Sequence, residues 1–114
     1  MLPTVPETIK LQRPGSCVPT AIACLPQLKD GRDYVIEGWV QFGDRGRQHE
    51  HTWMVVAGQT FDPSIIQFRR LKGYDKGPRR QFRDVYPVEE YRLVWLMMRS
   101  PWWMIRLRSF GVQL

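Results

Sequence analysis

The chain has 114 residues, of which 43% are apolar, 12% aromatic and 25% charged. This length predicts a single domain over residues 1–114 and excludes two, and the ordinary share of charged residues excludes an intrinsically disordered chain. The formal net charge of +6 is compatible with an acidic or nucleic-acid-bearing partner.

No segment of the sequence has the pattern of a membrane-targeting signal. The N-terminus has no basic stretch followed by an apolar one, and no window of about 18 residues is free of charge. Cys17 and Cys24 lie seven residues apart on one predicted helix, which is too far for an unstrained disulfide. We therefore expect two free thiols and a cytoplasmic protein without a transmembrane segment.

The first third of the chain predicts an irregular segment followed by a helix. Residues 1–15 contain three prolines and are expected to be irregular. The helix is predicted over about 17–28, with Ser16 as its N-cap and Pro26 kinking or ending it. Apolar residues recur at intervals of three and four, which predicts one buried stripe of Ala21, Cys24, Leu25 and Leu28.

The middle of the chain predicts a sheet. Residues 34–42 alternate in the manner of a strand, with Tyr34, Ile36, Val40 and Phe42 on one face. A loop at 43–47 leads to a second strand at about 50–56, and a tight turn leads to a short third strand at 59–62. Short connections favour antiparallel neighbours. We therefore predict an α+β fold in which the helix packs on a small antiparallel sheet.

The last part of the chain is harder to assign. Residues 63–68 are expected to leave the sheet, and the basic segment 69–83, with seven basic residues and one acid, is predicted to be a loop. A helix is expected to start at Pro87, although 93–98 fits a helix or a buried strand. The Trp-rich C-terminal tail, 101–108, is expected to pack on the core rather than self-associate or contact a membrane interface.

Cys17 is the candidate nucleophile. A thiol in the first turn of a helix meets unpaired N–H groups and the positive end of the helix dipole, and both favour the thiolate. The same N–H groups are suited to an oxyanion. The alternative is that Cys17 is a small buried core residue. Cys24, deeper on the same helix face, is predicted to be structural.

His51 and Asp62 are the candidate base and orienting acid. A short hairpin brings Asp62 next to the strand of His51, where its carboxylate is expected to accept the Nδ1–H of the imidazole. The alternatives are a structural histidine and an Asp-Pro turn. His49 is the rival base, and a zinc site that includes both histidines is disfavoured because the spacing matches no known pattern. We expect no metal and no cofactor.

Three further residues are candidates for substrate or oxyanion contacts. Gln12, five residues before Cys17, could donate an N–H to an oxyanion, or be an exposed polar residue. Trp39 and Trp53 could line the cleft, although core packing is the favoured interpretation of both.

These motifs resemble the transglutaminase-like branch of the papain-like cysteine superfamily. The matching pieces are Gly15-Ser16-Cys17 before a helix, Glu37-Gly38-Trp39 in a strand, His51-Thr52-Trp53, and Phe61-Asp62-Pro63-Ser64. The stretch 17–64 is also similar to lasso-peptide leader peptidases and to small bacterial and phage proteins. The resemblance implies a papain/transglutaminase-like core in which Cys17 is the nucleophile, His51 the general base and Asp62 the orienting acid. The step from His51 to Asp62 is shorter than in large transglutaminases.

The sequence therefore predicts a cysteine hydrolase or acyltransferase that acts on an amide of a protein or peptide, by hydrolysis, deamidation or transamidation. The alternative is a non-catalytic binder or inhibitor. It would use the tail and the basic residues against an acidic or nucleic-acid-bearing partner, through Arg69, Arg70, Lys72, Arg79, Arg80 and Arg83.

Overall fold

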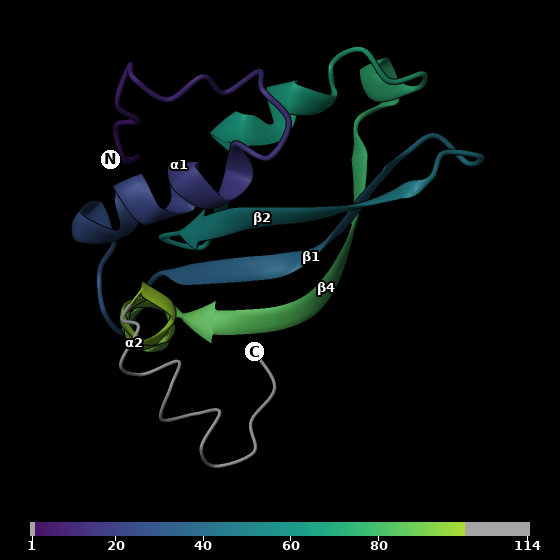
Figure 1. Ribbon diagram of the computed structural model, residues 1–114. Coiled ribbons are helices and arrows are strands. Elements are labelled where there is room, and N and C mark those ends of the chain that lie inside the picture. The colour runs from purple at the N-terminus through teal and green to yellow at the C-terminus, as the bar shows by residue number, and fades with distance from the viewer. Residues whose placement is uncertain (1, 100–114) are drawn as a thin grey trace.

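The computed structural model describes residues 2–99, so the tryptophan-rich tail lies outside the described residues. Within these residues, four antiparallel strands form one sheet in the order β3-β2-β1-β4, and the fold is α+β as predicted. Helix α1 lies along β2, and helix α2 lies at the end of β4 (Figure 1). The helices and strands are α1 Cys17–Cys24, β1 Tyr34–Phe42, β2 Gln48–Val56, β3 Gln59–Phe61, β4 Pro78–Pro87 and α2 Val88–Arg99.

Helix α1 follows the predicted pattern but is shorter. It ends at Cys24 and continues only as a 3-10 turn over Leu25–Gln27, because Pro26 cannot donate a helical hydrogen bond. The predicted stripe is confirmed, since all four of its side chains are buried. Ser16 occupies the N-cap position without capping: its hydroxyl donates to the carbonyl of Leu11 at 2.7 Å instead.

Strand β1 is the centre of the sheet and has the predicted bounds. β2 begins at Gln48, two residues earlier than predicted, and pairs with β1 so that His51 lies opposite Gly38. The turn from β2 to β3 passes through Ala57 and Gly58, both with positive φ, and the amide of Ala57 donates to the buried carboxylate of Asp33 at 2.9 Å. This turn fixes how β3 returns alongside β2.

The prediction of a loop over 69–83 is wrong for its second half. Residues 78–87 form β4, which pairs with β1 across a β-bulge between Glu37 and Gly38. An edge strand tolerates the alternating charges of this segment because one side of it meets solvent, and their density masked the strand pattern. The part of 69–83 that precedes β4 is irregular apart from a 3-10 turn at Tyr74–Lys76 and follows another 3-10 segment at Pro63–Phe68.

In the described part of the chain, two apolar clusters hold the elements together. The first joins both helices to the sheet, and each large side chain buried there contributes about 1.5–3 kcal/mol. Its members are Ala21, Cys24, Leu25, Leu28, Val35, Met54, Val56, Val88 and Tyr91. The second cluster joins Ile36, Val40, Phe42 and Trp53 to the 3-10 segments through Ile65, Phe68 and Tyr74. Residues 93–98 belong to helix α2, and no helix within 2–99 is long and apolar enough to cross a membrane.

Candidate active site

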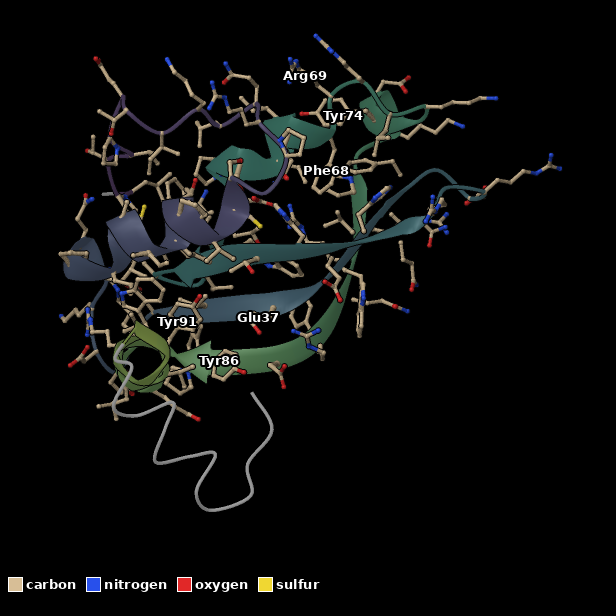
Figure 2. All side chains as sticks on the ribbon, in the orientation of Figure 1. Glu37, Phe68, Arg69, Tyr74, Tyr86 and Tyr91 are labelled. Carbon is tan, nitrogen blue, oxygen red and sulfur yellow. The ribbon has the colours of Figure 1, made fainter. Side chains whose placement is uncertain are left out.

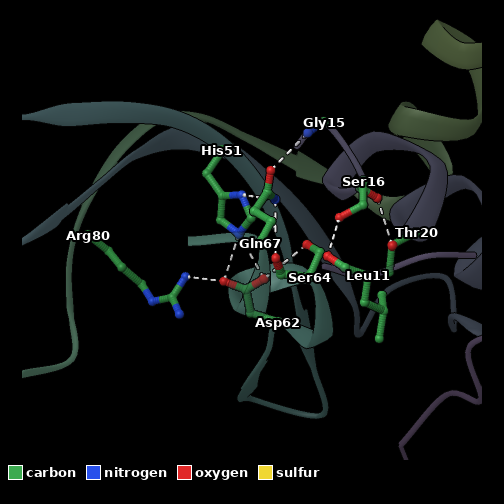
Figure 3. A network of polar contacts seen from close by, with 9 residues as sticks. All are labelled: Leu11, Gly15, Ser16, Thr20, His51, Asp62, Ser64, Gln67 and Arg80. Atoms are coloured by element: carbon green, nitrogen blue, oxygen red, sulfur yellow. Dashed lines mark hydrogen bonds and ion pairs between the residues drawn. The ribbon is translucent and has the colours of Figure 1, made fainter. Parts of the chain in front are cut away.

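The β2–β3 hairpin brings His51 and Asp62 together. Nε2 of His51 lies 2.8 Å from Oδ1 and 2.9 Å from Oδ2 of Asp62, and the two side chains are only 0% and 4% exposed (Figure 3). Asp62 precedes a 3-10 helix but makes no capping bond to its backbone, so both oxygens remain for side-chain partners. The expectation that Asp62 binds Nδ1 is wrong, because the side-chain rotation of His51 presents Nε2 to the carboxylate. The other ring nitrogen, Nδ1, lies 3.4 Å from the side-chain amide nitrogen of Gln67.

Cys17 is half-buried at the start of α1. Burial raises the pKa of its thiol, but hydrogen bonding with His51 and with the backbone amides of Thr52 and Val18 outweighs burial and lowers it. The amide of Thr52 is accessible because β3 pairs with β2 only from Met54 to Val56. The thiol therefore meets N–H groups from the helix start and from the sheet at one point.

The pKa of the His51 imidazole shifts in the opposite direction to that of the thiol. Burial lowers its pKa, but hydrogen bonds and charge interactions with Asp62 and Cys17 outweigh burial and raise it. A lowered thiol pKa beside a raised imidazole pKa favours proton transfer from sulfur to nitrogen. Both shifts move the pair towards thiolate and imidazolium, and the carboxylate of Asp62 favours the protonated ring.

Arg80 completes the charge arrangement. Its Nη1 donates to Oδ2 of Asp62 at 2.8 Å (Figure 3). Its guanidinium lies 4.9 Å from the ring centroid of Trp53. The side chain is 19% exposed and comes from β4, two strands away from His51. Cys17, His51, Asp62 and Arg80 thus form a row of alternating charges when the thiol is ionised.

Gln67 is a site residue that the sequence prediction missed. Its Oε1 accepts from the amide of Gly15 at 2.9 Å, and its Nε2 donates to the carbonyl of Ser64 and lies 3.4 Å from Nδ1 of His51. It therefore connects the loop that leads into Cys17 to the imidazole of His51. The available signal was a lone polar residue within the apolar run 65–68.

The predicted auxiliary residues occupy different places. Trp53 is 1% exposed and stacks on the His51 ring at 5.9 Å between centroids, so it packs against the imidazole. Trp39 pairs with Glu50 and Gln81, which places it on the opposite face of the sheet from His51. Gln12 is exposed, and its carbonyl accepts from Arg69 at 3.2 Å. The rival base His49 is half-buried against Phe68.

The basic residues of 69–83 divide into two groups. Four of them have polar partners: Arg69 bonds to the carbonyl of Gln12, Arg79 pairs with Asp44, Arg80 pairs with Asp62, and Arg83 pairs with Glu37 and Asp84. The other three, Arg70, Lys72 and Lys76, are exposed. The segment is therefore not a continuous row of free cations.

No group of three His, Cys, Asp or Glu side chains in the described part of the chain is arranged to hold a metal ion. Comparison of the chain with models of protein families, with curated proteins and with solved structures finds no match.

Proposed function

We propose that this protein is a cysteine-dependent acyl-transfer enzyme that acts on an amide of a peptide or protein. Cys17 is the nucleophile, His51 the general base and acid, and Asp62 the residue that orients the imidazole. The observation that carries the proposal is the placement of His51, bound through Nε2 to a buried carboxylate and interacting with a thiol at a helix start.

The reaction follows from these positions. The Cys17 thiolate attacks the carbonyl carbon, and backbone N–H groups of the first turn of α1 stabilise the oxyanion that forms. The imidazolium of His51 gives its proton to the departing amine as the C–N bond breaks, leaving a thioester. His51 then takes a proton from water as water attacks the thioester. The products are a carboxylic acid, an amine and the regenerated thiol.

The order of Cys17, His51 and Asp62 along the chain supports a transglutaminase-like assignment, which remains part of this proposal. Hydrolysis of a peptide bond or deamidation of a side chain is the preferred outcome, because a half-exposed thiol in a small domain excludes water poorly. The non-catalytic alternative is less favoured because most of the basic residues it requires already have partners.

The test is a reaction with a complex peptide mixture in oxygen-18 water, followed by mass spectrometry. We expect the wild-type protein to introduce the heavy isotope into new carboxyl groups and Cys17→Ala to introduce none while keeping its melting temperature. Iodoacetamide at about pH 6 should modify Cys17 and spare Cys24. Isotope incorporation that persists in Cys17→Ala, or equal modification of the two thiols, would contradict the proposal.

A further inference from the structure

A basic groove lies next to the candidate site. The loop between β1 and β2 packs against residues 71–76, and this approach requires Gly73, where a Cβ atom would lie 3.0 Å from the carbonyl oxygen of Phe42. Together the two segments enclose a cavity of about 480 Å³. Its lining residues are Phe42, Gly43, Asp44, Arg45, Gly46, Lys72, Gly73 and Lys76.

A second cavity extends the first towards His51. It measures about 260 Å³ and shares Phe42, Gly46 and Lys72 with the first. Its other lining residues are Arg47, His49 and Leu71. We call the two cavities together the basic groove. His49 lies two residues from His51 on β2, and both rings contact Phe68, with centroid distances of 5.4 and 5.1 Å. The groove therefore ends at the wall of the candidate active site.

The charges of the basic groove are largely uncompensated. Arg45, Arg47, Lys72 and Lys76 are all exposed, and none has an ion pair within residues 2–99. The one acid in the groove, Asp44, is already paired with Arg79. Four cations around two connected cavities create a positive potential that attracts anionic groups.

We propose that the basic groove binds acidic side chains of the peptide substrate and so directs the adjoining amide to Cys17. This inference rests on the function proposed above and adds the substrate class. A peptide fits better than a nucleic acid because the aromatic rings at the groove pack on each other and are not free to stack on bases. Phe42 is 2% exposed, and its ring centroid lies 5.4 Å from that of Tyr74. Leu71, an exposed residue that lines the second cavity, provides an apolar contact beside the cations. The nearby side chains of Phe68 and Tyr74 are labelled in Figure 2.

Affinity labelling tests the proposal without requiring turnover. The probe is a dodecapeptide of Glu and Gly with an N-terminal chloroacetyl group, and its control carries Gln at each Glu position. The Cys17 sulfur displaces chloride from the chloroacetyl carbon and forms a thioether. We expect the acidic probe to modify wild-type Cys17 about 10-fold faster than the neutral probe at low ionic strength, and the difference to vanish at about 0.5 M salt.

Matched charge-reversal variants test whether the rate advantage of the acidic probe depends on the basic groove. Arg45→Glu/Lys72→Glu should remove the advantage of the acidic probe, whereas Lys10→Glu/Lys29→Glu, which changes the net charge equally at exposed sites outside the groove, should keep it. The rate with iodoacetamide should be the same in all three proteins, because none of these residues contacts the thiol or His51. The proposal would be overturned if the two probes modified the wild type at equal rates. It would also be overturned if Lys10→Glu/Lys29→Glu lost the rate advantage of the acidic probe.

A binding measurement separates this proposal from the proposed function. Cys17→Ala should bind a fluorescein-labelled acidic dodecapeptide in fluorescence anisotropy, and the groove variant should not. If iodoacetamide fails to modify wild-type Cys17 while this binding persists, the catalytic function fails and the acidic-ligand groove stands. If a single-stranded oligonucleotide binds more tightly than the acidic peptide and depends on Arg45 and Lys72, the assignment to a peptide is overturned.

Discussion

Cys17 and Cys24 are the same residue type at the two ends of α1, and they have opposite chemical properties. Cys17 is half-buried, and its pKa is lowered by His51 and by two backbone amides that outweigh burial. Cys24 is 0% exposed, and burial alone raises its pKa. Two helical turns therefore separate a thiol that favours ionisation from one that resists it.

The comparison shows that the helix alone does not activate a thiol. Both residues lie on α1, but only Cys17 meets the helix start, the amide of Thr52 and the imidazole of His51 together. Cys24 packs with Leu25, Leu28 and Met54 and contributes to the core. Reactivity is set by what the rest of the fold brings to each end of the helix.

The largest expected change follows removal of the imidazole. In His51→Asn the Cys17 thiol loses its proton acceptor, and we expect its alkylation by iodoacetamide near pH 6 to slow about 100-fold, approaching the behaviour of Cys24. His49→Asn is the matched control on the same strand and should leave the rate unchanged. The measurement is peptide-resolved mass spectrometry of the alkylated protein. An unchanged rate in His51→Asn would show that the helix start and backbone amides suffice to activate Cys17.

The next largest expected effect is a difference between Cys17 and Cys24 in how their alkylation rates depend on pH. Because the pKa of Cys17 is lowered, its thiolate persists below the ordinary range of a thiol, and alkylation should decline about 10-fold per pH unit only below that lowered pKa. Cys24 has a raised pKa and should react only at alkaline pH. Turnover should fall again at high pH, as the raised pKa of His51 is passed and the leaving amine loses its proton donor. Parallel alkylation profiles for the two thiols would contradict this assignment.

A smaller change is expected at Arg80. Arg80→Met keeps the packing over Trp53 but removes the cation beside Asp62, so kcat should fall about 10-fold with little change in KM. The uncompensated carboxylate should also raise the pKa of His51 and move the alkaline limb upward. Arg80→Lys should restore most of the activity, and Arg79→Met, on the exposed neighbour, should have no effect. Loss of kcat without movement of the alkaline limb would indicate a purely structural role.

The smallest change is at Cys24, and it concerns stability alone. Cys24→Ala leaves a small cavity between α1 and the sheet, so the free energy of unfolding should fall by about 1 kcal/mol in urea titrations. Turnover and Cys17 labelling should remain at wild-type levels. A loss of Cys17 labelling would mean that packing at the far end of α1 controls the site.

The sequence predicted the contact between His51 and Asp62, which lie on one hairpin. It did not predict the contacts of Arg80 and Gln67, whose partners lie farther away along the chain. The helix stripe, β1 and the β2–β3 hairpin follow from periodicity, and the hairpin alone places Asp62 next to His51. Arg80 was expected on a free basic surface, because single-sequence periodicity gives no sign that β4 pairs with β1 and turns that side chain inward. Gln67 was missed because its partners lie 16 and 52 residues away. The nitrogen that faces Asp62 depends on a side-chain rotation that no spacing rule determines.

The position of β4 also sets the order in which the site is completed during synthesis. Cys17, His51 and Asp62 are all encoded before residue 63, while the strand that carries Arg80 is the last of the four described strands to be made and pairs with β1. A nascent chain therefore exposes its sulfur, ring and carboxylate before the guanidinium that balances them exists. Because a strand cannot pair before it is synthesised, the complete set of four groups is available only after β4 has left the ribosome.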